Sequence, residues 1–394
     1  MAADRPRYVP FAYGFRPFFL AAGLHAVIAV GAWAWILGSG GAPFGRMPPL
    51  LWHGHEMLFG FIGAAIAGFL LTAVPSWTGS RGFAGAPLIV LALLWLAGRV
   101  AFACAASLAW PAVAVVELAF LPLLAILIGR SLLRERNRNF PMLIIVAVLW
   151  TIDGWFLHAI SSGDYPLAGK ALRVGINVVL LLMTVIGGRI VPSFTANALR
   201  ARGIAVEIRS RPTVEAVVIA SMALAVAVDA VAPWHWAAGF VAVVAALAQV
   251  VRLSGWLSLR TIDEPIVWVL HAAYAWLPLG LALKAAHLLG GVSWAEHWQH
   301  ALTIGAAATM ILAVMTRASL GHTGRPLVVS RGIAIAYVLL LLAAVVRVFG
   351  PALLPAAYLA TVEAAALLWI AAFAIYVIGY APILTQERAD GKPG

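Results

Sequence analysis

Runs of about 20 apolar residues recur along almost the whole chain, and a helical run of that length matches the hydrocarbon thickness of a bilayer. Only short connections separate the runs, which leaves no room for a soluble domain. The sequence therefore predicts an all-α integral membrane protein, a bundle of about 12 transmembrane helices that forms a single polytopic membrane domain over residues 1–394. The expected spans lie near residues 17–38, 52–76, 86–106, 109–130, 140–160, 168–192, 213–232, 236–257, 266–290, 297–320, 330–349 and 355–380.

Composition excludes a soluble globule. Apolar residues make up 63% of the chain and charged residues only 10%, whereas soluble domains are roughly 45–50% apolar and about 25% charged. The net charge of +11 would suggest a nucleic-acid partner in a soluble protein, but in a membrane protein it first points to basic loops. We expect the lipid bilayer, and no nucleic acid, as the partner.

Basic residues concentrate in alternate connections. Arginines cluster after residues 109–130, after residues 168–192 and after residues 297–320, while the opposite connections carry few. By the positive-inside rule, this parity predicts that both termini are cytoplasmic. The longest polar connection is expected to run from Ser193 to Pro212.

The richest set of potential ligands lies at the start of the second span. Residues 52–60 read Trp-His-Gly-His-Glu-Met-Leu-Phe-Gly and supply His53, His55, Glu56 and Met57. Imidazole, thioether and carboxylate groups can coordinate copper or haem iron, and they are costly to bury in hydrocarbon without a partner. The alternative is that the histidines lie in the headgroup region beside Trp52.

Helical geometry divides this motif into two faces. At about 100° per residue, His53, Glu56 and Met57 share a small, polar side, whereas His55 falls on a side with bulky apolar residues. His53 is therefore the preferred haem ligand. His55 would join it only if the terminal turn redirects its side chain.

A second histidine is expected at the same depth as His53. His300, near the start of the span at residues 297–320, is the candidate partner for axial haem ligation. The alternative is an interfacial role for this region, which contains several tryptophans. In the span at residues 266–290, His271 faces away from Lys284, and Lys284 is expected to extend to the headgroups.

Charged groups inside other spans allow two interpretations. Arg189 and Arg317 can bind haem propionates or an anionic substrate, or they can anchor helices to phospholipid. Four carboxyl groups lie inside apolar runs and are costly unless neutral or paired. They can form a proton route or pair with nearby arginines, and the sequence leaves both open; they are Glu117, Asp153, Asp229 and Glu363.

Five motifs in order along the chain resemble the NnrS family, polytopic haem- and copper-containing membrane proteins associated with the bacterial response to nitric oxide. These motifs are Tyr-Gly-Phe-Arg-Pro-Phe-Phe at residues 13–19, the motif at residues 52–60, Ala-Gly-Phe-Leu-Leu-Thr-Ala-Val-Pro at residues 67–75, Gly-Gly-Arg-Ile-Val-Pro-Ser-Phe-Thr at residues 187–195, and Val-Met-Thr-Arg-Ala-Ser-Leu-Gly-His-Thr-Gly-Arg-Pro at residues 314–326.

The resemblance implies haem b, copper, a multi-pass location in the bacterial cytoplasmic (inner) membrane, and a role in relieving nitrosative stress. The family's motif histidines carry over to His53, His55, His271, His300 and His322. Which of them bind haem and which bind copper stays open. The candidate assignment gives haem the residues His53, His300, His271 and His322, with Arg189, Arg317 and Arg16 as partners of the propionates, and gives copper the residues His55, Met57 and Glu56.

A more distant likeness links the chain to the main subunit of haem-copper oxidases. There a His-Gly-x-x-Met pattern opens the second span and its histidine binds haem, a pattern that begins here at His53 and supports its assignment. The chain lacks the adjacent His-His pair of those enzymes, which speaks against simple oxidase chemistry.

Three functions are compatible with these features. The first is a haem/copper protein that binds nitric oxide or a related small ligand, or helps remove it, as an oxidoreductase if it is an enzyme. The second is a transporter of a metal or metal adduct, and the third is a haem-binding sensor or assembly subunit without turnover. The sequence does not identify the electron donor, the number of haems or the oligomeric state.

Overall fold

The computed structural model describes residues 9–40 and 47–392, and every regular element in these ranges is a helix. Within them, 12 helical segments are long and apolar enough to cross a membrane. The predicted fold class is confirmed: the chain is a multi-pass, all-α membrane protein. The orientation of its termini stays a prediction.

The spans agree closely with the expected ones. In chain order they are α1 (Phe15–Ser39); α2 (Pro49–His55), η1 (Glu56–Ile62) and α3 (Gly63–Thr78); α4 (Ala86–Ala103); α5 (Trp110–Leu118) and α6 (Phe120–Arg134); α7 (Pro141–Ser161); α8 (Tyr165–Ala201); α9 (Pro212–Val231); α10 (Trp236–Ser254); α11 (Pro265–Gly290); η3 (Ser293–Ala295), α12 (Trp298–His300), η4 (Ala301–Ala308) and α13 (Thr309–His322); α14 (Arg331–Leu353); and η5 (Pro355–Ala357) with α15 (Tyr358–Thr385). A short 3₁₀ helix, η2 (Ser258–Thr261), precedes α11.

The predicted connection from Ser193 to Pro212 is wrong over its first half, because α8 continues to Ala201. Pro192 lies inside this helix without ending it. The residues that follow include alanine, leucine and arginine, which favour helix. The hydroxyl of Thr195 also donates to the carbonyl of Val191 at 2.9 Å, so the polar connection shortens to residues 202–211.

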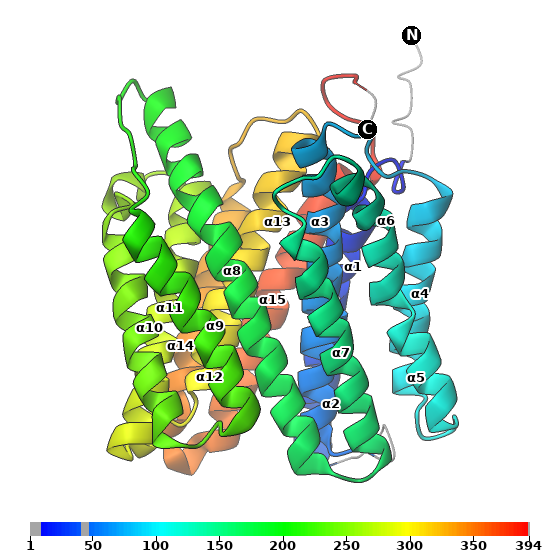
Figure 1. Cartoon of the computed structure of the whole chain (residues 1–394), viewed down its shortest axis with the longest axis vertical. Helices are drawn as coiled ribbons and strands as arrows, with labels where there is room; N and C mark the ends of the chain where they lie inside the picture. Colours follow the sequence, from blue (N-terminus) through cyan, green and yellow to red (C-terminus); the bar gives the residue numbers. More distant parts are fainter. Residues whose placement is uncertain (1–8, 41–46, 393–394) are drawn as a thin grey trace. The chain divides into compact units, whose positions relative to one another are not determined.

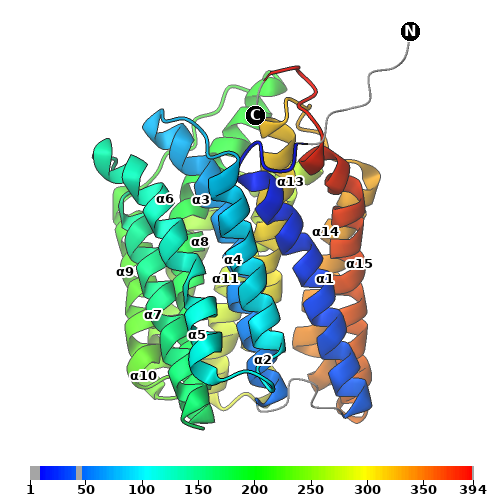
Figure 2. The same ribbon diagram turned by 90° about the vertical axis from the view of Figure 1, so that its right-hand side faces the viewer.

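By internal packing the chain divides into two compact units, which we describe separately. Unit 1 comprises residues 1–172, 315–327 and 373–394. In it α1 packs on η1 and α3, α4 packs on α5, and α6 runs beside α7 (Figures 1 and 2). The amide of Val9 donates to the carbonyl of Thr385 at 2.6 Å, so the described start and end of the chain meet.

Unit 2 comprises residues 173–314 and 328–372. Its α10 packs against both α9 and α11 (Figure 1), and α11 and α14 both pack on η4. The prediction of one membrane domain over residues 1–394 is not decided by this division and stays a prediction.

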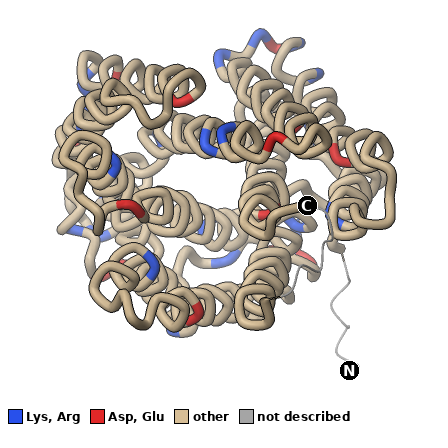
Figure 3. The backbone as a smooth tube through the Cα atoms, turned by 90° about the horizontal axis from the view of Figure 1, so that it is seen from below, with Lys and Arg blue, Asp and Glu red and all other residues tan. Residues whose placement is uncertain are grey.

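Charged residues occupy only short stretches of the backbone (Figure 3), as expected from the low charge content.

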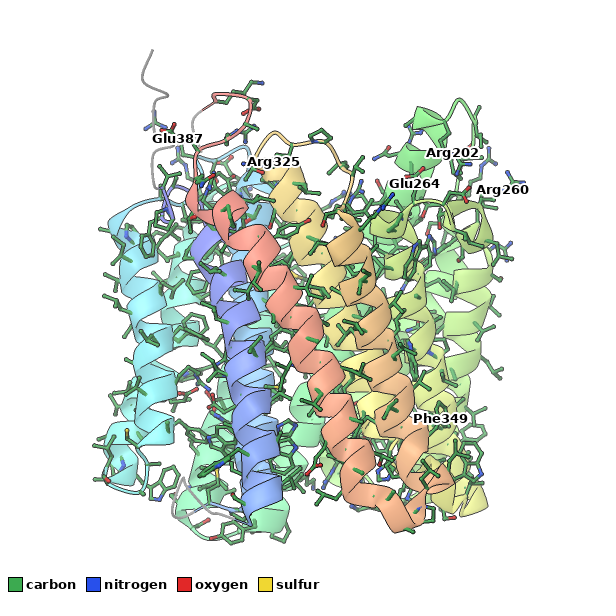
Figure 4. The ribbon with its side chains drawn as sticks, turned by 180° about the vertical axis from the view of Figure 1, so that it is seen from behind. Arg202, Arg260, Glu264, Arg325, Phe349 and Glu387 are labelled. Carbon is green, nitrogen blue, oxygen red and sulfur yellow. The ribbon has the colours of Figure 1, made fainter. Side chains whose placement is uncertain are left out.

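In unit 2, Arg202, Arg260 and Glu264 lie at one end, whereas Phe349 lies towards the other (Figure 4). The guanidinium of Arg202 donates to the carbonyl of Arg260 at 3.3 Å and pairs with Asp263 at 3.4 Å. Two connections that the sequence places on the same side of the membrane therefore meet at this end.

Candidate metal centre

The ligand-rich motif at residues 52–60 contains a change of helix type. Pro49 occupies the first turn of α2, where its missing N–H costs nothing, and the α-helix ends at His55. Residues Glu56–Ile62 then form a π-helix. The indole of Trp95 donates to the carbonyl of Gly60 at 3.1 Å within this wider turn. Turns of this type are rare and occur often at functional sites.

His55 and Glu56 lie at the junction of α2 and the π-helix, and their side chains are close together. The His55 Nδ1 and Glu56 Oε1 atoms are 3.5 Å apart, and the His55 ring is fully buried. The helical wheel placed His55 on the side of Phe59, and the two rings do lie 5.0 Å apart; the wheel did not show that Glu56 also lies close to the imidazole. Met57 is half-buried in the same turn, and as a copper ligand it stays a prediction, separate from the histidine–carboxylate group described next.

Two acidic residues from other helices complete the group around His55. Its Nε2 atom lies 3.0 Å from Asp153 Oδ1 on α7 and 3.8 Å from Glu117 Oε1 on α5. Each of the three side chains offers a ligand atom, and all of these atoms lie within 4.8 Å of one another. All three residues are buried.

A single guanidinium joins the acidic groups. Arg99 on α4 contacts Glu56 Oε1 at 2.6 Å through Nη1 and contacts Glu117 through Nη2. On the other side, His25 Nε2 lies 2.9 Å from Glu56 Oε2. A Cβ atom on Gly98 would collide with the Glu117 carboxylate, so the glycine allows this close approach. Six buried side chains, which we call the acidic cluster, thus form one connected group: His25, His55, Glu56, Arg99, Glu117 and Asp153.

The acidic cluster carries more negative than positive charge. It contains three carboxylates and one guanidinium, so with both histidines neutral its net charge is −2. An uncompensated charge in an apolar interior costs several kcal/mol, and neutralisation by protons or by a cation removes that cost. A divalent cation supplies the missing charge.

The donor atoms fit a divalent transition metal. In this cluster Glu117 Oε2 and His55 Nδ1 are buried and make no hydrogen bond, so each keeps a lone pair for another partner. One imidazole and two carboxylates suit iron(II), manganese, zinc or copper(II) better than copper(I), which prefers sulfur. The rings of Phe102, Phe156 and Phe59 lie 3.9, 4.8 and 5.0 Å from the His55 ring and exclude water from it.

A void of about 10 Å³ borders the cluster. Glu117 and Asp153 form its polar side, and its apolar side includes Phe59, Ile66 and Leu149. This is about the space that one water molecule needs. A single small ligand can therefore reach the carboxylates from an apolar direction.

The predicted haem ligands lie elsewhere. His53 stacks on Trp33 of α1, with ring centroids 4.6 Å apart and planes at 24°. His300 ends α12, and the π-helix η4 follows it directly, just as η1 follows His55. His53 belongs to unit 1 and His300 to unit 2, so their pairing across a haem stays a prediction.

His271 and His322 have contrasting surroundings. Both ring nitrogens of His271 face hydroxyl groups, with Thr195 Oγ1 at 2.7 Å and Ser258 Oγ at 2.9 Å. The ring of His322 lies 6.0 Å from that of Tyr13 and 5.7 Å from that of Phe15, centroid to centroid. Their assignment as haem ligands stays a prediction.

The three arginines expected to meet propionates occupy different positions. Arg16 is fully buried, and its Nη1 lies within hydrogen-bond distance of the carbonyls of Ile383, Leu384 and Gln386 at the end of α15. Arg189 lines a cavity in unit 2, and Arg317 is buried. The structure thus gives Arg16 a helix-capping role.

Sequence reasoning did not assemble the acidic cluster. It identified His55 and Glu56, and it allowed Glu117 and Asp153 to pair with nearby arginines, which the contact between Arg99 and Glu117 confirms, but it did not bring these groups to His55. The available signal was that these charges interrupt long apolar runs, where an unpaired charge is costly.

The expectation that Lys284 extends to the headgroups is wrong. Its side chain is 2% exposed, contacts Asp229, and lies 5.0 Å from the centroid of the Trp298 ring. Asn177 donates to the same Asp229 carboxylate at 2.7 Å. A buried carboxylate on α9 holds the ammonium inside unit 2.

The family model described as NnrS protein matches residues 9–388 of the chain, nearly its whole length. No curated protein matches it.

Proposed function

The chain belongs to the NnrS family, and we propose that it is a haem/copper protein of the bacterial cytoplasmic membrane that binds nitric oxide, or helps remove it, and so relieves nitrosative stress. The observation that carries the proposal is the acidic cluster, a buried group with two more negative than positive charges and with unused donor atoms. The resemblance from the sequence supplies copper, haem b and nitric oxide.

His55, Glu117 and Asp153 would hold the metal, with Glu56 beside them. A bound redox-active metal supplies the orbital that binds nitric oxide and the electron that changes its reactivity. Arg99 holds the carboxylates of Glu56 and Glu117 in place and offsets one of their charges. His25 lies 2.9 Å from the second oxygen of Glu56 and would help to orient this carboxylate beside the metal.

The void beside Glu117 and Asp153 supports a small, uncharged ligand. Nitric oxide is diatomic and close to water in size, and its low polarity favours entry from the apolar side of a void of about 10 Å³. A larger or charged substrate would have to displace the phenylalanines around His55. Size and polarity therefore select the ligand.

Haem is the second part of the proposal, and its axial candidates are His53 and His300, followed by His271 and His322. Support comes from the π-helix that follows His300, which widens the helix beside a potential ligand. Within unit 2, Gly305 in η4 lies so close to Trp276 that a Cβ atom would collide with the indole. The indole of Trp276 therefore fills the space beside this glycine.

Metal and haem analysis of two matched variants tests the proposal. His55→Ala should lower the bound copper at least tenfold and keep the haem, because it removes the imidazole of the cluster. His53→Ala should keep the copper and lose haem absorbance. Stopped-flow mixing with nitric oxide then separates consumption from simple binding. A wild-type protein without a Soret band, made with ample haem, would contradict the haem part, and unchanged copper in His55→Ala would contradict the metal part.

A further inference from the structure

Unit 2 contains a cavity of about 660 Å³ that the proposed metal chemistry does not use. It lies beneath residues 206–210, in the connection that follows Arg202 at the charged end of this unit (Figure 4). Its walls come from α8, from the start of α9 and from the end of α10. We call it the basic cavity.

The lining of the basic cavity is positively charged. Four arginines face two glutamates, which leaves a formal charge of +2; they are Arg189, Arg200, Arg209 and Arg252, with Glu207 and Glu215. Both glutamates already pair with arginine: Glu207 lies 3.0 Å from Arg209, and Glu215 contacts Arg252. An anionic ligand would therefore meet an excess of guanidinium groups rather than a balanced lining.

A rigid polar network closes the cavity. Arg252, which is 5% exposed, donates through Nη1 to the carbonyl of Thr184 and to the hydroxyl of Tyr274, each at 2.8 Å. The hydroxyl of Tyr274 donates in turn to Gln249 at 2.6 Å. A Cβ atom on Gly188 would overlap the Arg252 guanidinium, so only glycine fits there. This floor is pre-organised and does not need a ligand to form.

Apolar residues line much of the remaining wall, and part of this wall follows one face of α8, where apolar residues alternate with arginines. Val185, Arg189, Pro192, Ala196 and Arg200 recur every three to four residues, so they share a stripe along the helix. A cavity of about 660 Å³ is in the range that accepts a ligand of drug-like size, and it is far larger than a free phosphate ion needs. The lining suits an anion attached to an apolar body.

We propose that the basic cavity binds the phosphate headgroup of an anionic membrane lipid. Guanidinium groups match phosphate in shape and charge, and basic pockets between transmembrane helices bind such headgroups. Arg189 contacts the headgroup inside the cavity, and Arg200 attracts it at the rim. The apolar stripe of α8 packs along the glycerol and the first part of the acyl chains.

Lipid binding by the full-length protein tests this proposal. The protein is purified in detergent and titrated with phosphatidylglycerol, and bound lipid is counted by native mass spectrometry, with phosphatidylcholine as the neutral probe. We expect one phosphatidylglycerol to be retained in preference to phosphatidylcholine. The double variant Arg189→Gln/Arg200→Gln should bind it at least about tenfold more weakly, since each arginine near an anionic lipid contributes roughly a fivefold factor.

Two further variants control the comparison. Arg134→Gln/Arg138→Gln removes two exposed arginines from unit 1 and should leave lipid binding unchanged. Ser193→Phe places an aromatic ring in the cavity while keeping all four arginines, and it should weaken binding as much as the double variant. Unchanged melting temperatures establish that these variants are folded.

Several results would overturn the proposal. Equal retention of both lipids, or equal binding by the wild type and the two cavity variants, would show that the cavity takes no anionic headgroup. Displacement of phosphatidylglycerol by millimolar inorganic phosphate would assign the site to a soluble anion. A parallel loss of haem in Arg189→Gln/Arg200→Gln would assign these arginines to the haem propionates.

Discussion

The two units bury their charges in different ways. In unit 2 the carboxylates that we compare each contact a base: the buried Asp229 contacts Lys284, and the half-buried Glu215 contacts Arg252. In unit 1 three carboxylates share Arg99, and two histidines lie against them. A balanced pair needs nothing more to be neutral, whereas an acidic excess needs protons or a cation. The comparison separates charges that hold helices together from charges that can hold a metal.

The largest expected effect is the loss of Arg99. Arg99→Leu leaves three buried carboxylates without a fixed counter-charge, and we expect a loss of stability of at least about 3–5 kcal/mol. For a membrane protein this should appear as a large drop in folded yield and melting temperature, measured by size-exclusion chromatography of heated samples. Wild-type yield and melting temperature would contradict the role of Arg99 as the fixed cation of the cluster.

The second prediction concerns the pair of Lys284 and Asp229 in unit 2. Removing both partners should cost less stability than removing one. Lys284→Met alone leaves the buried Asp229 carboxylate without its ammonium partner and should cost about 3–5 kcal/mol, while Lys284→Met/Asp229→Leu should recover most of that loss. Melting temperatures of the three proteins measure the effect. In unit 1, Arg99→Leu/Glu117→Gln should recover little, because two carboxylates remain. Equal recovery in both units would remove the distinction between them.

The next prediction concerns the close packing of Gly188 against Arg252 in unit 2. Gly188→Ala forces the Arg252 guanidinium to move, because the new methyl group would overlap it, and we expect a loss of about 1–3 kcal/mol. Gly31→Ala is the matched control, since a Cβ atom there meets nothing within 4 Å. Removal of a helical glycine at such a site should raise the melting temperature slightly. A similar loss in both variants would show that the glycines act through the backbone alone.

The smallest effect concerns an exposed pair. Hydrogen bonding from Arg388 lowers the pKa of Asp390 to about 2. Because the pKa in the folded protein lies below the ordinary value, the pair stabilises the fold at neutral pH, and this contribution is lost as the pH falls from about 4 towards 2. Asp390→Asn should therefore lower the melting temperature at pH 7 only slightly, and by still less near pH 2, where about half of the Asp390 carboxyl groups are protonated. A loss as large as that of Lys284→Met would contradict the view that burial sets these energies.

Sequence reasoning predicted the fold well because hydropathy depends only on local composition. Each of the 12 spans matches an expected one, and the main discrepancy, at α8, arose because residues after Pro192 are polar yet helical. The stretch at residues 193–201 has the low hydropathy of a loop, but its residues favour the helical conformation.

The site was predicted only in part. His55 and Glu56 could be selected from their chemistry, but the π-helix that begins at Glu56 was not revealed by any sequence period. The partners Glu117 and Asp153 come from other helices, and which helices meet is a tertiary property. Lys284 illustrates the same limit, because its length allowed it to reach the headgroups and only Asp229 on a neighbouring helix decided otherwise.

The most direct test of the central claim is X-ray absorption at the edge of the bound metal in the purified protein. A centre held by His55, Glu117 and Asp153 predicts a first coordination shell of nitrogen and oxygen atoms at about 2.0–2.2 Å, with one imidazole and no sulfur. In Asp153→Asn the metal content should fall, while Asp229→Asn, the same change in unit 2, should keep it. A shell containing sulfur, or one unaltered by Asp153→Asn at full metal content, would contradict the claim that the acidic excess of unit 1 is the metal site.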